Sequence, residues 1–334
     1  MPIRDCRNSL PHSESSPCLK QTCSTQLLPS DMTTHSFTFQ VHEDDHVLAD
    51  SDLNARAHVS STDKGQGARL TFSFDDGYKS TIDSTISILT HFGFPASYNI
   101  IVDRVGQDGF GSWDDWRVAA DQGMEISSHS LTHPFFPSSL LGEVEWLRDT
   151  FNLTKEIRRK ALFWAYVGRS FATTFRIGKH QLCREIVQSK QMIENNISSL
   201  TVESFVYPRG RCNNSVLNMV ASAGYSSARS SVGLNSFQHL DPYRLKGRFW
   251  LSSTSVEQAN KWVREAIESK AWLIEVFHLV GKTRPPDHPL FTSIQKFREH
   301  IQYVAKQNLT VDTQKAIVRE IGNRKLEHIR WPTS

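Results

Sequence analysis

The sequence predicts an α/β protein in which short parallel strands alternate with helices. Three observations predict this class: strand-like and helix-like segments alternate from Leu70 onward, the strands are apolar enough to be buried on both faces, and six or more units fit within about 250 residues. That many units favour a closed (β/α) barrel over an open sheet, although hydrophobic periodicity alone does not separate the two. In either fold, ligands bind beyond the carboxyl ends of the strands.

The first half of this region has three expected strands, at 70–74, 96–102 and 125–128. Between the first two, apolar side chains recur every three or four residues from Ile82 to Phe92, which predicts a helix. Ser112 is placed to cap the next helix.

In the second half, further strands are expected at 205–207, 245–251, 272–280 and 309–311. The third of these is strongly apolar. Two helices are expected to begin at capping boxes, Ser255-x-x-Gln258 and Thr292-x-x-Gln295.

The chain divides into three parts by composition. Residues 1–66 are rich in Ser, Thr, Asp and His and lack sustained apolar periodicity, which predicts a disordered tail. Residues 67–322 form the expected folded domain, and residues 323–334 form a C-terminal tail.

Composition also limits the partners. The 334 residues carry a net charge of +3, which is too balanced to favour nucleic acid or an acidic membrane surface. No run approaches the ~20 apolar residues of a membrane span, and the N-terminus lacks an apolar stretch of signal-peptide length. A protein that acts in the cytoplasm is the default expectation, and an incorrectly assigned N-terminus would leave secretion open. The sequence gives no indication of the oligomeric state.

Polar residues follow several of the expected strands. Asp75-Asp76-Gly77 comes after the first and His129-Ser-Leu-Thr-His133 after the third. Tyr207-Pro-Arg-Gly210 ends a later strand, and His278 lies near the end of the strongly apolar one. Each motif alone is commonly structural, such as a turn or a core histidine, but their placement at matching strand ends favours a functional site.

The residue types in this group suit a catalytic metal. Side chains of adjacent carboxylates leave the backbone in different directions, so one can bind an ion while the other faces the substrate as a base. Two histidines spaced i, i+4 meet on one face of a helical turn and can bind the same ion. Two imidazoles and one carboxylate leave coordination positions open for water and substrate, which is typical of catalytic zinc.

Two motifs resemble a known family. Phe72-Ser-Phe-Asp-Asp-Gly77 and His129-Ser-Leu-Thr-His-Pro134 are similar to the first two motifs of the polysaccharide deacetylase family, carbohydrate esterase family 4. This family includes chitin, chitooligosaccharide and peptidoglycan deacetylases. The resemblance extends from about Ala68 to about Ile321 with a gap in the middle, and it implies a distorted (β/α) barrel.

The resemblance also implies a role for each site residue. Asp75 would be the general base, and one divalent ion, expected to be zinc, would be bound by Asp76, His129 and His133. The segment Tyr207-Pro-Arg-Gly210 would supply the oxyanion and substrate contacts, with the N–H of Arg209 holding the oxyanion. His278 would be the acid. The implied reaction removes an N-acetyl or O-acetyl group from a carbohydrate by attack of a metal-bound water.

The chain departs from the family pattern in three places. Many members have an arginine two residues before the motif proline, where it braces the base, and this chain has Val206 there. Arg248 is the expected substitute, and a solvated strand-end charge is the competing interpretation. Many members have tyrosine at the position of Arg209. An insertion near 142–182 is interpreted as a lid, as a neutral surface insertion, or as an artefact of the gene model.

Two other functions remain open from the sequence. The same scaffold also hosts hydrolases of small cyclic amides and imides. A catalytically inactive carbohydrate-binding relative is the third possibility. Retention of Asp75, His129, His133 and His278 favours an active enzyme, because a degraded site usually loses one such residue.

Overall fold

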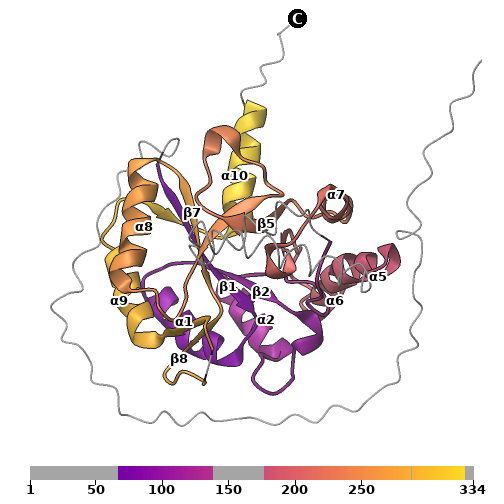
Figure 1. The fold of residues 1–334 in the computed structure, drawn as a ribbon, viewed down its shortest axis with the longest axis horizontal. Coiled ribbons are helices and arrows are strands. Elements are labelled where there is room, and N and C mark those ends of the chain that lie inside the picture. The colour runs from indigo at the N-terminus through magenta and orange to yellow at the C-terminus, as the bar shows by residue number, and fades with distance from the viewer. Residues whose placement is uncertain (1–66, 138–176, 287, 328–334) are drawn as a thin grey trace, which may run out of the picture. The chain divides into compact units, whose positions relative to one another are not determined.

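The computed structural model describes residues 67–137, 177–286 and 288–327 of the chain (Figure 1). The tail predicted for residues 1–66 lies outside the described residues. So do the insertion up to residue 176 and the last part of the C-terminal tail.

Seven parallel strands close into a barrel, which confirms the predicted fold class. They pair in chain order, and the first strand also pairs with the seventh, from Arg69 opposite Trp272 to Phe74 opposite Phe277. An open sheet lacks this closing pair. The strands are β1 (Arg69–Asp76), β2 (Ser97–Ile100), β3 (Glu125–Ser128), β4 (Ser204–Val206), β5 (Ser227–Val232), β6 (Leu245–Phe249) and β7 (Trp272–Phe277).

Three short strands lie outside the closed barrel. β10 (Thr310–Val311) pairs with the first two residues of β1. β8 (Leu279–Gly281) and β9 (Phe291–Ser293) form a separate parallel pair. The strand predicted for 272–280 is therefore two strands, because the chain leaves the barrel at His278.

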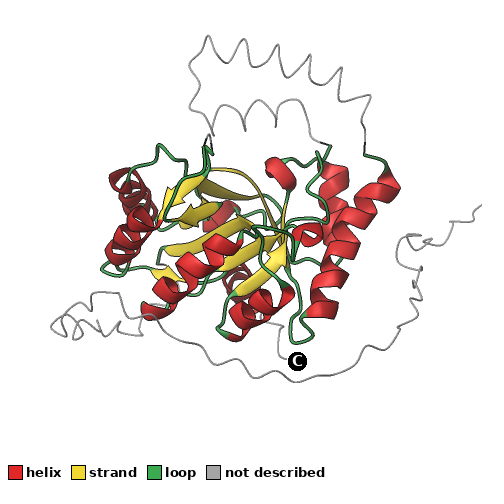
Figure 2. Cartoon of the chain, turned by 90° about the horizontal axis from the view of Figure 1, so that it is seen from below, coloured by secondary structure: helices red, strands yellow, loops and turns green. Residues whose placement is uncertain are grey.

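Helices surround the strands (Figure 2). In the middle of the chain, the helix at Lys179–Cys183 (α5) continues through a π-helical turn at Arg184–Gln188 (η4) into the helix at Ser189–Asn196 (α6). The longer helices are α1 (Lys79–His91), α2 (Trp113–Asp121), α5 (Lys179–Cys183), η4 (Arg184–Gln188), α6 (Ser189–Asn196), α7 (Asn214–Ser222), α8 (Val256–Glu268), α9 (Ile294–Val304) and α10 (Gln314–Glu327). The 3₁₀ turns are η3 (Val102–Arg104), η5 (Pro208–Gly210) and η6 (Phe237–His239). Among these described helices, none has the length and apolar character needed to cross a bilayer.

Two of the three predicted helix caps are confirmed. The side chain of Ser112 accepts a hydrogen bond from the N–H of Asp115, and that of Ser255 accepts one from Gln258. The third prediction, Thr292, is wrong by one residue. Thr292 remains in β9, and Ser293 caps α9 instead.

Alternation along β7 separates two apolar layers. Leu273 and Phe277 belong to the large core shared with the helices, whereas Trp272, Ile274 and Val276 pack in a second cluster. Since strand side chains alternate between faces, the second cluster fills the barrel interior.

Helix α10 closes the amino end of the barrel. Its first N–H groups donate to the side chains that begin β2 and β3: Gln314 to Oγ of Ser97 (3.0 Å) and Lys315 to Oε2 of Glu125 (3.1 Å). Ile317 of this helix joins the interior cluster. The helix runs to Glu327, past residue 322, where the sequence predicted the domain to end.

Candidate active site

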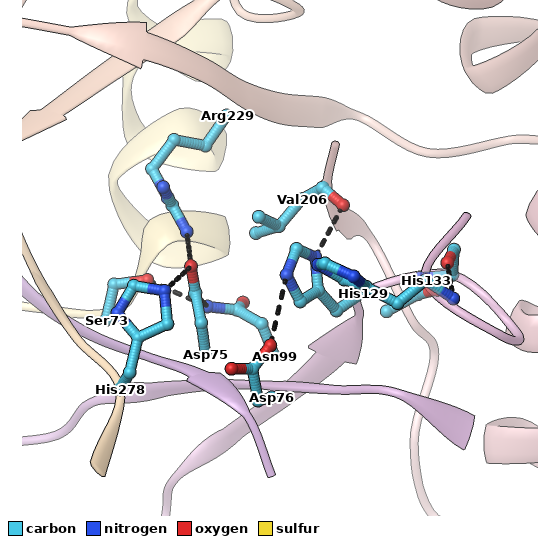
Figure 3. A network of polar contacts seen from close by, with 11 residues as sticks. Ser73, Asp75, Asp76, Asn99, His129, His133, Val206, Arg229 and His278 are labelled. Carbon is cyan, nitrogen blue, oxygen red and sulfur yellow. Dashed lines mark hydrogen bonds and ion pairs between the residues drawn. The ribbon is translucent and has the colours of Figure 1, made fainter. Parts of the chain in front are cut away.

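The site begins where β1 ends. Asp75 and Asp76 are its last two residues, and Gly77 follows. Asp76 and Gly77 have left-handed backbones with φ of 73° and 85°. This turn separates the two carboxylates: Asp75 points toward Arg229 and Asp76 points toward His129 (Figure 3). The two carboxylates therefore point in different directions, as the sequence analysis expected, and their separate roles stay a prediction.

Three predicted ligands lie together. Asp76, His129 and His133 each offer one ligand atom, and these atoms lie within 4.8 Å of one another. Nε2 of His129 is 3.7 Å from Oδ1 of Asp76, and the two imidazole centroids are 4.7 Å apart. One carboxylate and two imidazoles in this arrangement fit a single divalent ion. We call these three residues the metal cluster.

The two histidines lie on a loop, which corrects the prediction of a helical turn. Ser130 and His133 both have positive φ, 69° and 59°. Side chains satisfy the N–H groups of this loop. Oε2 of Glu185 accepts from the N–H groups of Leu131 (3.0 Å) and Thr132 (2.8 Å), and Oγ of Ser130 accepts from His133 (3.0 Å). The loop thus needs no helical hydrogen bonds.

The imidazole of His129 is oriented by a backbone carbonyl. Its Nδ1 lies 2.9 Å from the carbonyl oxygen of Val206. A carbonyl can only accept, so Nδ1 is the donor, and Nε2, which faces Asp76, is the ring nitrogen available to a metal. Burial, followed by the proximity of His129, lowers the pKa of His133. A neutral imidazole is the form that binds a metal, so both histidines fit this role.

Asp75 is buried, with 3% of its surface exposed, and it is held by two donors. Nη2 of Arg229 lies 2.6 Å from both carboxylate oxygens, and Nδ2 of Asn99 lies 2.8 Å from Oδ1. Burial alone would raise the pKa of Asp75. The charge of Arg229, with smaller effects from His129 and His278, outweighs burial and lowers the pKa to about 2.

The expectation that Arg248 braces Asp75 is wrong. Its guanidinium lies 2.7 Å from Oε2 of Glu265 on α8 and over the ring of Trp262. Side chains alternate along β6: Leu245 belongs to the interior cluster, and a Cβ on Gly247 would contact Arg229. Arg248 therefore faces outward. The expected bracing cation exists, but β5 supplies it.

His278 lies on the opposite side of Asp75 from Asn99. Its Nε2 is 3.9 Å from Oδ2 of Asp75 (Figure 3), and its ring stacks on Phe249 with centroids 6.1 Å apart. The same phenyl ring lies 5.6 Å from Cζ of Arg229. Burial lowers the pKa of His278.

The side chain of Tyr207 is fully buried and packs against Phe205, and its N–H donates to the carbonyl of Arg229 (3.1 Å). Its hydroxyl has no hydrogen-bond partner among the described residues. The predicted substrate contact of Tyr207 stays a prediction. Arg209 is exposed and has a left-handed backbone with φ of 57°, and its oxyanion role stays a prediction.

Sequence reasoning missed Asn99, Glu185 and Arg229. Asn99 had a usable signal, since it is a polar residue in the middle of an apolar strand. Arg229 had none, because the segment Ser227–Val232 is mostly serine and shows neither apolar alternation nor an apolar run. Glu185 lies in a helical segment with exposed polar neighbours, Arg184 and Gln188, so its burial had no sequence signal.

A (β/α) barrel with a carboxylate–histidine cluster beyond its strand ends defines a class of barrel hydrolases. The sequence model of the polysaccharide deacetylase family matches residues 62–228. The chain belongs to the polysaccharide deacetylase family, and it is accordingly a hydrolase of carbon–nitrogen bonds in acylated carbohydrates.

Several solved structures are similar to this chain at low sequence identity, and the first of them shows the same fold. A candidate polysaccharide deacetylase from Mycobacterium smegmatis is 12% identical, with a TM-score of 0.52 over 80% of this chain and 94% of that one. A family 4 acetyl xylan esterase from Clostridium thermocellum, in complex with a cobalt ion, is 14% identical, with a TM-score of 0.45 over 77% and 91%. A family 4 carbohydrate esterase from Streptomyces lividans is 16% identical, with a TM-score of 0.41 over 72% and 88%. No curated protein matches the sequence.

Proposed function

We propose that this protein removes acetyl groups from a carbohydrate and that its activity depends on one divalent ion, with zinc as the natural choice. The metal cluster would hold the ion through Asp76, His129 and His133. When bound, such an ion lowers the pKa of water to about 7 and polarises the acyl carbonyl. The observation that carries the proposal is the position of Asp75, which adjoins this cluster and is tied to Arg229 instead of being part of it.

Asp75 is proposed as the general base. Its lowered pKa keeps it ionised at neutral pH, so it can accept the proton of the attacking water. A free carboxylate beside a divalent ion would turn toward the ion. The hydrogen bonds from Arg229 and Asn99 prevent this rotation and leave Asp75 facing the substrate.

His278 is proposed as the acid that protonates the leaving nitrogen. Its ring stacks on Phe249, and its Nε2 lies 3.9 Å from Oδ2 of Asp75. The proposed base and acid are therefore adjacent at the carboxyl ends of β1 and β7. His278, neutral before the reaction, would take over the proton that Asp75 removes from the water and pass it to the nitrogen as the carbon–nitrogen bond breaks. The N–H of Arg209 is proposed to stabilise the negative charge that develops on the acyl oxygen.

The test is acetate release by metal-supplemented enzyme from chitooligosaccharides and acetylated xylan, with cyclic ureides offered in parallel. Asp75→Asn should keep the metal and lose turnover. Asp121→Asn, an exposed carboxylate at the end of α2, is the matched control and should behave as wild type. Hydrolysis of a cyclic ureide without acetate release would replace the proposal by the cyclic-amide alternative. If Asp75→Asn keeps most of its kcat, the assignment of the base is wrong.

A further inference from the structure

The loop that carries the two histidines, residues 129–133, has a strained backbone. We call these residues the histidine loop. Ser130 and His133 have φ of 69° and 59°, in the left-handed region that is unfavourable for a residue with a Cβ atom. Residues keep such a conformation only where the surrounding structure holds them in it. The hydrogen bonds of these two residues therefore indicate what fixes the histidine loop.

The N–H groups of both strained residues donate to serine hydroxyls. The N–H of His133 donates to Oγ of Ser130 (3.0 Å), and the N–H of Ser130 donates to Oγ of Ser128, the last residue of β3 (3.2 Å). Both serines are inaccessible to solvent. Because water cannot replace either acceptor, the backbone of the loop depends on where the hydroxyl of Ser128 is held.

The hydroxyl of Ser128 is held in turn by α6. It donates to Oγ of Ser189, the first residue of that helix (2.8 Å), and Oγ of Ser189 donates to the carbonyl of Ile186 (3.1 Å). The hydroxyl of Tyr225 donates to the same carbonyl (2.9 Å) and lies 3.5 Å from Oγ of Ser189. We call Ser128, Ser189 and Tyr225 the hydroxyl chain.

The hydroxyl chain ends in the π-helical turn η4. Turns of this kind depart from the α-helical hydrogen-bond pattern and are frequent at functional sites. Glu185 and Ile186 are neighbours in this turn. The carboxylate of Glu185 accepts from two N–H groups in the middle of the histidine loop, and the carbonyl of Ile186 accepts from the hydroxyl chain. The same turn therefore anchors the loop at two places.

The ring of Tyr225 ties the hydroxyl chain to the core. It packs against Phe205 of β4 with ring centroids 5.1 Å apart, and Nζ of Lys190 lies 5.1 Å from its centroid. The residue after Phe205 is Val206, whose carbonyl orients His129. The backbone of the histidine loop and the imidazole of His129 are thus held from the same part of the barrel.

We propose that the hydroxyl chain positions the metal cluster by holding the histidine loop in its strained conformation. Its three members are positioning residues, since none of them belongs to the metal cluster. The effect on the loop stands on the hydrogen bonds alone. The effect on the ion rests on the proposed function: a loop held in this way keeps two imidazoles beside Asp76, so it sets the affinity for the divalent ion.

The first experiment needs no metal. Amide hydrogen exchange of Ser130 and His133, followed by nuclear magnetic resonance in the metal-free protein, reports how often the loop opens. Tyr225→Phe keeps the ring and removes one hydroxyl, so both amides should exchange roughly tenfold faster than in wild type. Ser128→Ala should have a larger effect, because it removes the acceptor of the Ser130 N–H itself. Ser189→Ala tests the same chain if Ser128→Ala does not fold.

The matched control is Tyr98→Phe. The hydroxyl of Tyr98 is also buried and lies 2.7 Å from Oγ1 of Thr85 on α1, so this change removes the same atom from a comparable contact elsewhere in the fold. It should lower the melting temperature, as Tyr225→Phe does, but leave the exchange of the histidine loop unchanged. This comparison separates a positioning role from a general loss of stability.

The second experiment measures the ion. The Kd for zinc, from competition with a chelating indicator, should rise roughly tenfold in Tyr225→Phe and stay unchanged in Tyr98→Phe. The visible absorption spectrum of the cobalt-loaded protein, which reports the geometry of the ligands, should change in Tyr225→Phe alone.

The two experiments separate this inference from the proposed function. Unchanged loop exchange and unchanged zinc affinity in Tyr225→Phe would overturn the inference and leave the proposed function standing. The same changes in Tyr98→Phe would also overturn it. Faster loop exchange in Tyr225→Phe, in a protein that binds no zinc even as wild type, would support the hold on the loop and refute the proposed metal dependence.

Discussion

A single nitrogen of Arg229, Nη2, lies 2.6 Å from both carboxylate oxygens of Asp75. Both residues are nearly inaccessible to solvent, and they are 154 positions apart in the chain. Removing one partner from such a buried pair leaves an uncompensated charge, so the pair constrains any change at either position.

Arg229→Gln should reduce kcat roughly a hundredfold by freeing the proposed base from its position. It should also shift the pH profile. Arg229 is the main group that lowers the pKa of Asp75, so its loss raises that pKa. The acid limb of kcat/KM, below which Asp75 is protonated, should therefore move to higher pH. The control is Arg248→Gln, since Arg248 pairs with Glu265 on the outside of the barrel. An acid limb that stays in place in Arg229→Gln would contradict this role.

His129→Ala and His133→Ala should each lose most of the bound divalent ion, because each removes one of the three ligand atoms of the metal cluster. Metal content after dialysis, measured by mass spectrometry, checks this. Chelation of the wild-type protein should abolish acetate release, and added zinc should restore it. His91→Ala, at the exposed end of α1, should keep a full complement. Undiminished metal content in both His129→Ala and His133→Ala would contradict the assignment of these residues as metal ligands.

Glu185→Ala should weaken metal binding although Glu185 is not one of the proposed metal ligands. The carboxylate of Glu185 holds two N–H groups and the hydroxyl of Thr132 in the loop between the two histidines. Losing these contacts should cost about 1–3 kcal/mol of stability and release the loop. Thermal unfolding and a zinc titration measure the two effects. Glu257→Ala, on the exposed side of α8, should alter neither, and equal behaviour of the two variants would count against the loop role.

Gly247→Ala should destabilise the protein and impair turnover. A Cβ at this position would lie 2.6 Å from Cγ2 of Val276 and 3.3 Å from Cδ of Arg229. Overpacking of this kind costs about 1–3 kcal/mol, and here it presses on the residue that holds Asp75. Gly322→Ala is the control, since nothing lies within 4 Å of the added atom and it stands within helix α10. Its melting temperature should rise slightly. A stable and fully active Gly247→Ala would show that the barrel can absorb the extra volume.

The parts of the fold that follow simple periodicity were predictable from the sequence. β1 and β3 appear within two residues of their expected bounds, and the helices capped by Ser112 and Ser255 begin where they were expected. β5 was not predictable, because its burial comes from closure of the barrel and not from apolar side chains of its own. The local sequence pattern does not reveal a strand whose polar side chains are buried and hydrogen-bonded within the fold.

The active site likewise has features that the sequence predicts and features that only the fold determines. The motifs identified Asp75, Asp76 and the two histidines, but not the conformation of the histidine loop. That conformation depends on Glu185, which is distant in sequence. Val206 illustrates a second limit. Its side chain replaces the arginine found in many relatives, yet its carbonyl orients His129, a contribution that any residue at this position could make.

The contacts of α10 have a consequence for biosynthesis. β1 is the first strand of the barrel to be translated, yet its partners β7 and β10 follow roughly 200 and 240 residues later. The side chains at the amino ends of β2 and β3 likewise gain their hydrogen bonds from Gln314 and Lys315 only after α10 has been synthesised. A growing chain on the ribosome thus carries the first strand with one unpaired edge until β7 has been synthesised, and contacts of such long sequence separation slow folding. We therefore expect the protein to be more prone to aggregation, and more dependent on chaperones, during this interval than after the barrel has closed.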